Sequence, residues 1–258
     1  MEKALDWLGK HHEDIVRGLA DLVAIPSIST DGEHRAEIDR TAALTVDQMR
    51  AAGLNNADVL RVGGSLPYAY GEWLDAPGKP TVFLYAHHDL QPINFVEQWK
   101  TDPWKLTRRD GRLYARGAAD DKGAISAFLG AIAAYRKTGN ALPVNVKMVV
   151  EGEEEIGSKN LLKFFDTHRD RIKSDVIVVC DTENIEVGLP CITYSLRGIV
   201  TALVEVTSAR IPVHSGMGGG ALPDAAVALN AVLGKLYWGN GPLANPGYYD
   251  RVRPMTEK

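Results

Sequence analysis

The chain is 258 residues long, which is enough for one or two domains with a buried core. Hydrophobic residues make up 45% and charged residues 24%, proportions that argue against a disordered chain. Lysines and arginines number 29 against 33 aspartates and glutamates, and the resulting charge of −4 argues against nucleic-acid and membrane-surface partners. No apolar run approaches the roughly 18 residues of a membrane span. The N-terminal segment lacks the apolar core of a secretion signal, and two cysteines make no disulfide framework, so we expect a cytoplasmic protein.

The first part of the chain predicts two amphipathic helices followed by two short strands. Apolar residues recur at helical spacing in the first two segments, and Pro26 and Gly53 mark the points where the helices stop. The strand-like runs are separated by glycine and serine, as expected for a turn. In chain order, we expect helices over residues 5–22 and 33–52 and strands over residues 58–62 and 68–74.

The middle of the chain predicts a parallel sheet. Three continuous apolar runs have the character of strands that are covered on both faces, and helical patterns lie between them. The expected elements are strand 81–86, helix 123–136, strand 144–150, helix 159–168 and strand 175–180. This alternation predicts an α/β fold with a mostly parallel sheet flanked by helices. The pair Asp110-Gly111, between two strand-like runs, predicts a hairpin turn.

The character of the sequence changes near Thr193. Residues 199–208 alternate like a half-exposed strand, and a glycine-rich stretch after His214 leads to a helical pattern over residues 223–237. We therefore expect two domains, covering residues 1–194 and 195–258.

Polar groups of the metal-binding type stand at the ends of the predicted parallel strands. The first of these strands leads into His87 and Asp89, the next into the acidic run 151–155, and the last into Asp181. Asp120 lies just before a predicted helix. Because ligands bind outside the carboxyl ends of the strands in an open α/β sheet, we expect these groups to converge on one rim.

These groups together indicate a divalent metal ion, which no single motif among them indicates alone. Histidine together with carboxylates suits zinc or a similar ion, and a further glutamate could act as general base on a metal-bound water. Taken singly, the acidic run reads as a solvated patch, Asp120-Asp121 as a helix N-cap pair, and His214 as an ordinary hydrogen-bonded histidine. A magnesium phosphohydrolase is disfavoured, because no glycine-rich phosphate loop follows a strand.

The ordered motifs resemble a known family. The segments IPSIS, YAHHDLQP, DGRLYARGAADDKG, EGEEEIGS, CDT, LPCITYSLRG and VHSGMGGG lie between about residues 20 and 224. Together they resemble the co-catalytic zinc metallopeptidases, which include carnosine-type dipeptidases, glutamate carboxypeptidase, acetylornithine deacetylase and succinyl-diaminopimelate desuccinylase. The dipeptidase branch is the most similar. The resemblance implies a zinc-peptidase-like catalytic domain with an inserted α+β lid domain.

The resemblance also implies a role for each matching residue. Glu154 would be the general base, Asp89 would orient a ligand histidine, and Glu153 would take no part. His214, in the lid, would reach the partner subunit's active site and stabilise the oxyanion. The Asp120-Asp121 peptide would be cis. The implied ligands of two divalent ions, zinc with manganese or cobalt as alternatives, are His87, Asp120, Glu155 and Asp181.

Family members are usually much longer, and the segment after the lid supplies a last histidine ligand. Because no histidine follows His214 here, we expect this chain to be an N-terminal fragment with a truncated lid. The implied function is hydrolysis of a dipeptide or similar small amide by a metal-bridging water, in a protein that forms a homodimer through its lid. Two alternatives remain open, an N-acyl-amino-acid deacylase or carboxypeptidase of the same family, and a non-catalytic form that only binds or dimerises.

Overall fold

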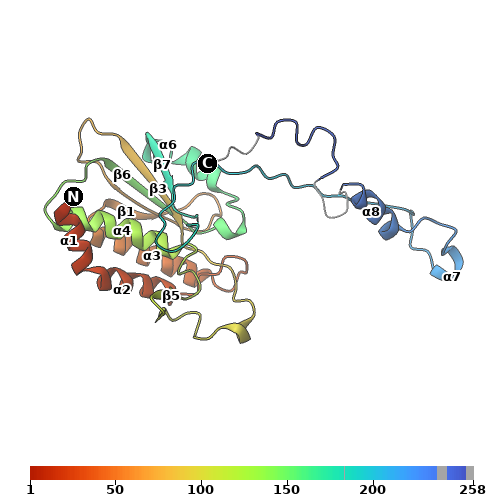
Figure 1. Cartoon of the computed structure of the whole chain (residues 1–258), viewed down its shortest axis with the longest axis horizontal. Helices are drawn as coiled ribbons and strands as arrows, with labels where there is room; N and C mark the ends of the chain where they lie inside the picture. Colours follow the sequence, from red (N-terminus) through yellow and green to blue (C-terminus); the bar gives the residue numbers. More distant parts are fainter. Residues whose placement is uncertain (183, 237–242, 254–258) are drawn as a thin grey trace. The chain divides into compact units, whose positions relative to one another are not determined.

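The computed structural model describes residues 1–182, 184–236 and 243–253. The chain divides into two compact units, residues Met1–Ile192 and Thr193–Lys258, which are described separately below. Figure 1 shows the elements of both. Within the described part of the chain, no helix combines the length and the apolar character that crossing a membrane would need.

A five-stranded mixed sheet forms the centre of the first unit, in the order β1-β2-β6-β3-β7. Strand β3 is parallel to both β6 and β7, whereas β1 and β2 extend the sheet in the antiparallel sense. The predicted α/β fold with helices flanking a central sheet is thereby confirmed, and the parallel part of the sheet consists of β6, β3 and β7. The five strands are β1 (Asn55–Leu60), β2 (Tyr68–Trp73), β3 (Thr81–His87), β6 (Asn145–Glu151) and β7 (Val176–Val179).

Four helices pack together on one face of this sheet. The predicted helix over residues 5–22 is in fact two helices, because the helical conformation is interrupted at His11. The next helix ends where Gly53 adopts the left-handed conformation at φ 100°, as its sequence predicts. The helices are α1 (Glu2–Lys10), α2 (His12–Val23), α3 (Arg35–Ala52) and α4 (Lys122–Lys137).

The side chains of the sheet alternate between two hydrophobic clusters. Met148 and Val150 of β6 point into the cluster beneath α3 and α4, whereas Val149 joins the cluster on the other face with Phe164. That second face is covered by the short helices α5 (Leu161–Thr167) and α6 (Arg169–Ile172). A parallel sheet with helices on both faces is the arrangement in which continuous apolar strands are stable.

Smaller elements connect the sheet to its rim. The predicted hairpin at Asp110-Gly111 forms, and both residues have positive φ, 53° and 72°. It joins β4 (Thr107–Arg109) to β5 (Arg112–Tyr114) in a separate two-stranded sheet. Two 3₁₀ helices complete the unit, η1 (Val96–Gln98) and η2 (Glu154–Ile156).

The second unit contains two helices, α7 (Ser215–Gly218) and α8 (Ala225–Gly234), among its described residues. The Asp224 carboxylate caps α8 by accepting hydrogen bonds from the main chain of its first turn. The strand predicted over residues 199–208 does not form, since no described segment pairs with it, and Leu203 is 93% exposed. The helix predicted to reach Tyr237 is described only as far as Gly234, and Tyr237 lies outside the described residues.

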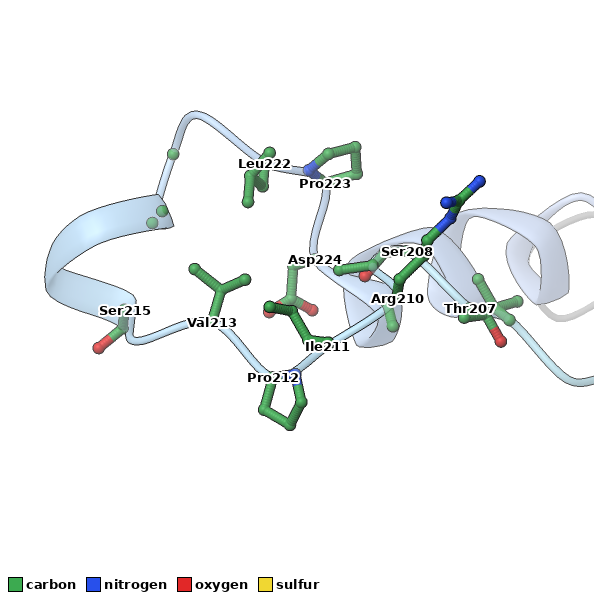
Figure 2. Close-up of a pocket in the computed structure, with 16 residues that line it drawn as sticks. Thr207, Ser208, Arg210, Ile211, Pro212, Val213, Ser215, Leu222, Pro223 and Asp224 are labelled. Carbon is green, nitrogen blue, oxygen red and sulfur yellow. The ribbon is translucent and has the colours of Figure 1, made fainter.

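Residues 206–225 of this unit enclose a cavity of about 520 Å³ (Figure 2). Val213 and Leu222 face each other across it, with the Asp224 carboxylate on a third side. The guanidinium of Arg210 extends away from these three side chains in the close-up. His214 is not among the residues that line the cavity.

Candidate metal centre

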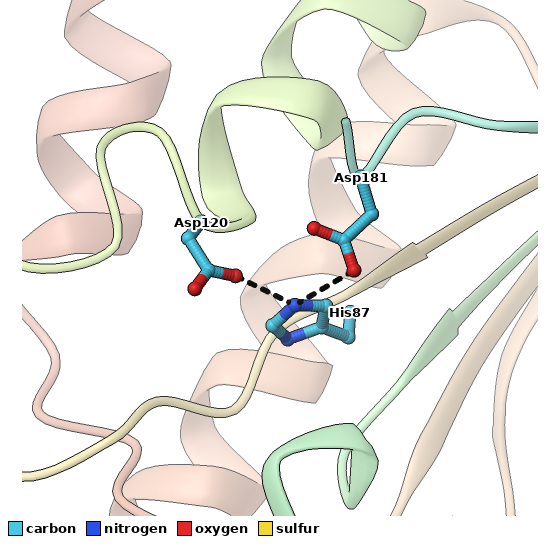
Figure 3. A group of neighbouring side chains, drawn as sticks. All are labelled: His87, Asp120 and Asp181. Carbon is cyan, nitrogen blue, oxygen red and sulfur yellow. Dashed lines mark hydrogen bonds and ion pairs between the residues drawn. The ribbon is translucent and has the colours of Figure 1, made fainter. Parts of the chain in front are cut away.

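Three predicted ligands meet at the carboxyl ends of the parallel strands. His87 is the last residue of β3, Asp181 follows β7, and Asp120 stands just before α4. The His87 Nε2 atom lies 2.9 Å from Asp120 Oδ1 and 3.8 Å from Asp181 Oδ2 (Figure 3). One ligand atom from each residue falls within 4.8 Å of the other two. The expected convergence on one rim of the sheet therefore occurs for these residues.

The two predicted glutamates lie beside this triad in different positions. Glu154 Oε2 is 3.9 Å from His87 Nε2, so it borders the triad directly. Glu155 is instead held by Gln91, whose Nε2 donates to Glu155 Oε2 at 2.9 Å and to its main-chain oxygen at 3.1 Å. Glu155 is not part of the group that comes within 4.8 Å.

Asp89 connects His87 to the turn after β6 that carries Glu154 and Glu155, which we call the glutamate turn. It is fully buried, and its Oδ1 lies 3.4 Å from His87 Nδ1. Its two carboxylate oxygens accept the main-chain N–H groups of Glu154 and Glu155, at 3.2 and 3.1 Å. Burial alone would raise the pKa of Asp89, but the contact with the His87 imidazole lowers it below its usual range. Asp89 is therefore an ionised anchor for both sides of the site.

The acidic surroundings dominate the electrostatics of His87. Burial opposes its protonation, yet the hydrogen bond and charge of Asp89, with the charges of Asp121 and Glu154, raise its pKa to about 10. Burial together with the neighbouring charges of Asp181 and Glu155 also raises the pKa of Glu154. A positive charge is thus strongly favoured at the centre of the cluster.

His88 behaves in the opposite way to its neighbour. It is completely buried, and burial lowers its pKa to about 4. Its Nε2–H donates to the main-chain oxygen of Pro67 at 3.1 Å, so it is a neutral packing residue. Asp121 is buried as well, its Oδ2 accepts the main-chain N–H of His87 at 3.1 Å, and burial raises its pKa to about 8. The sequence had suggested an N-cap role for Asp121, but its side chain makes no cap hydrogen bond.

Glu153 holds the backbone around the site in place, although its position in the motif implied that it takes no part in the reaction. It is 2% exposed, and its carboxylate accepts hydrogen bonds from the main-chain N–H of Leu66, the Tyr68 hydroxyl and both the main-chain and side-chain N–H groups of Asn160. These bonds tie the turn after β6 to the start of β2 and of α5. Leu66 and Tyr68 are more than 80 residues away in sequence, so motif spacing carried no signal of this role.

His214 lies in the second unit. It is exposed, and its Nδ1 accepts the main-chain N–H of Gly216 at 3.0 Å at the start of α7. The Asp120-Asp121 peptide in the first unit is cis, as the resemblance implies.

The family model of peptidase family M20/M25/M40 matches residues 83–252, a segment that contains His87, both aspartates of the triad and the glutamate turn. This chain belongs to that family. The match extends across both compact units and includes His214.

Relatives in the M20/M25/M40 family are similar over nearly the whole chain. Human Beta-Ala-His dipeptidase is 38% identical over 271 residues, which cover 100% of this chain and 54% of the relative. The Cys-Gly metallodipeptidase dug1 of Schizosaccharomyces pombe is 31% identical over 99% of this chain and 56% of its own length. The chain therefore spans about half the length of the curated relatives it matches.

Solved structures agree with the family assignment. Human carnosine dipeptidase 1 superposes with a TM-score of 0.76 at 34% identity, covering 99% of this chain and 56% of the other. An M20 family metallo-carboxypeptidase, Sso-CP2 from Sulfolobus solfataricus, gives a TM-score of 0.75 at 30% identity over 94% of this chain and 54% of that one. The α/β architecture is thus that of M20 peptidases.

The triad fits a divalent ion. One neutral imidazole and two carboxylates form a donor set that zinc accepts, and bond lengths near 2 Å would bring ligand atoms to within about 3.3 Å of each other. The present spacing of 2.9 to 3.8 Å from His87 Nε2 needs little adjustment. Burial is the main cause of the raised pKa values of Asp121 and Glu154, and the charges of neighbouring carboxylates add to it; a cation would offset that charge repulsion.

Proposed function

We propose that the whole protein hydrolyses dipeptides or similar small peptide amides with the help of bound divalent ions. The observation that carries this proposal is the meeting of His87, Asp120 and Asp181 beside Glu154 at the carboxyl ends of the parallel strands. Membership of the M20/M25/M40 family supports it, as do the activities for which the relatives are named, Beta-Ala-His dipeptidase and Cys-Gly metallodipeptidase.

His87, Asp120 and Asp181 would hold the first ion, and Asp120 would also contact a second ion together with Glu155. Zinc is the ion we favour, because imidazole and carboxylate ligands in one set suit it; manganese and cobalt are the alternatives. When bound, such ions polarise a carbonyl oxygen and lower the pKa of water. The neutral form of His87 that a ligand requires would be maintained by the charge of the ion in place of the proton.

The remaining residues of the site would position groups and move a proton. Glu154 would accept a proton from the attacking water and return it to the leaving amine, a role that its raised pKa supports. Asp89 would orient the His87 ring through Nδ1 and fix the backbone of the glutamate turn.

We further propose that residues 1–194 belong to the catalytic domain and residues 195–258 to a lid through which two subunits associate. The division of the chain into two compact units supports the first part of this proposal. His214 would then stabilise the substrate oxyanion from the lid of the partner subunit. A cytoplasmic location is consistent with Cys180 and Cys191, which are both free.

A substitution that separates proton transfer from metal binding tests the catalytic proposal. The full-length protein and its Glu154→Gln variant would be loaded with zinc, assayed for bound metal, and tested for hydrolysis of β-Ala-His and Cys-Gly. We expect activity to fall at least about 100-fold in the variant, because general acid–base catalysis contributes that much, while bound metal stays near the unmodified level. Activity that survives the substitution would refute the role of Glu154, and a chain that retains no zinc would refute the metal centre.

The similarity to a metallo-carboxypeptidase supports one competing substrate class. An amidohydrolase that prefers free dipeptides differs from a carboxypeptidase or deacylase in its need for a free substrate amine. Hydrolysis rates for a dipeptide and for the same dipeptide with an acetylated N-terminus would distinguish them. We expect the free dipeptide to be the better substrate.

A further inference from the structure

A pocket lies outside the metal centre, between residues 94–101 and the β4–β5 hairpin. It is a cavity of about 550 Å³, within the usual size range of small-molecule sites. We call it the aromatic–basic pocket, because the described residues that line it include three aromatic and three cationic side chains and no acidic one. The six are Phe95, Trp99, Lys100, Arg109, Tyr114 and Arg116.

Cation–π contacts place both guanidinium groups over aromatic rings of the pocket wall, a close one at Arg109 and a long one at Arg116. Arg109 Cζ lies 4.1 Å from the centre of the Tyr114 ring, and Arg116 Cζ lies 6.0 Å from that of Trp99. An arginine stacked on an aromatic ring keeps its N–H donors at the edge of the guanidinium plane, available to a further acceptor. The aromatic rings therefore orient the positive groups and add apolar surface beside them.

The hydrogen-bonding capacity of these arginines is only partly used. Arg109 Nε is 3.8 Å from Asp110, whose side chain is 85% exposed, so this ion pair is weak. Arg116 donates through Nη2 to the main-chain oxygen of Pro92 at 3.1 Å, but its Nε is buried and has no acceptor among the described residues. The Arg116 Nε is closed off from solvent, so a ligand would meet the remaining N–H groups of the two arginines. Donors beside aromatic surface favour a ligand that carries an anionic acceptor.

Phe95 supplies an apolar face at the rim of the pocket. Its φ of 51° is the left-handed conformation, which is unfavourable for a non-glycine residue, and the residue is 68% exposed. Trp99 Nε1 donates to the main-chain oxygen of Asn94 at 3.4 Å and helps to hold this segment. Strain that places a large apolar ring in solvent is typical of a residue that contacts a ligand.

We propose that the aromatic–basic pocket binds a small organic anion that carries an aromatic ring. The carboxylate would accept hydrogen bonds from Arg109 and Arg116, with Lys100 adding positive charge. The ligand ring would pack against Phe95 and Trp99. The residues that carry this inference are separate from the metal triad, so it does not rest on the proposed peptidase activity.

Titration calorimetry with 3-phenylpropionate tests the proposal on the full 258-residue chain. EDTA would be present throughout, so that the carboxylate cannot bind a metal ion instead. We expect 3-phenylpropionate to bind at least about tenfold more tightly than its neutral amide or than propionate, because each comparison removes one half of the recognition.

Two variants with a matched control locate the binding site. Arg109→Met removes a charged donor and should weaken binding about tenfold or more, whereas Arg112→Met, at the paired position on β5 and outside the pocket, should leave it unchanged. Trp99→Leu should weaken binding of 3-phenylpropionate more than that of propionate. No binding to the unmodified chain at millimolar concentration, or equal loss in the Arg109 and Arg112 variants, would overturn the proposal.

Discussion

Replacing Asp89 by asparagine tests how the candidate site is held together. The change preserves size but removes the charge of a fully buried side chain. Its two oxygens accept hydrogen bonds from the main chain of Glu154 and Glu155. An amide offers only one oxygen, so its NH₂ group must face one of these N–H donors, and the imidazole of His87 loses the anion beside its Nδ1 atom.

The expected destabilisation follows from the hydrogen bonds that the asparagine cannot make. A buried hydrogen bond to a charged group contributes about 1.5–3 kcal/mol, and at least one of the two is replaced by a repulsive approach of two donors. We therefore expect Asp89→Asn to lower the free energy of unfolding by about 3 kcal/mol. Zinc affinity should fall about 10–100-fold, as it does when the partner of a ligand histidine is removed.

Urea unfolding in the presence of chelator measures the first effect, and competition with a chromophoric chelator measures the second. Asp47→Asn is the matched control, because Asp47 pairs with Arg50 on the surface and its side chain is 70% exposed. Such exposed pairs contribute about 0–1 kcal/mol. If the Asp89 and Asp47 variants unfold at the same urea concentration and bind zinc equally, our account of Asp89 is wrong.

Two further predictions concern stability. The pKa of His87 is raised to about 10, so protonated His87 stabilises the folded state fully below about pH 6.5, and this stabilisation is lost as the pH rises through 10. The pKa of Asp121 is raised to about 8, so the folded state also loses stability as the pH rises from 4 to 8. Urea unfolding in EDTA should therefore show stability falling between about pH 6.5 and 9, and a flat or rising profile would contradict these assignments. Gly152→Ala should cost about 1–3 kcal/mol, because its Cβ would lie 2.5 Å from the main-chain oxygen of Pro67, whereas Gly9→Ala, with nothing within 4 Å, should be neutral or slightly stabilising in the same assay.

The sequence was most informative where buried strands end. Continuous apolar runs identified β3, β6 and β7, and the rule that ligands gather at the carboxyl ends of parallel strands then brought His87 and Asp181 together. Asp120 lies in a separate segment of the sequence, and it comes close to His87 because α4 begins at the same rim of the sheet. Local pattern and topology were sufficient for this part of the site.

Contacts between distant segments could not be predicted in the same way. The partners of Glu153 in the 66–68 segment, and the hydrogen bonds from Gln91 to Glu155, depend on which loops become neighbours after folding. Exposure differs from expectation for a similar reason. The apolar composition of β7 predicted burial on both faces, but Ile177 is 64% exposed, because β7 lies at the edge of the sheet and no helix of the described residues packs closely against it. The amino-acid composition of a strand indicates the environment that it prefers, whereas the elements packed against the strand determine how exposed its side chains are.

The register of the parallel strands β3 and β6 determines both the packing of the sheet and the position of His87. His87 of β3 pairs with Glu151 of β6, so the turn that carries Glu154 begins level with the imidazole. Shifting β3 by one residue would put Ala86 at that position and would also turn its apolar side chains to the opposite faces of the sheet. Phe83 belongs to the cluster under α5 and Ala86 to the cluster under α4, so such a shift would cost burial on both faces. The packing that makes the sheet stable is therefore also what holds the histidine within reach of the carboxylates.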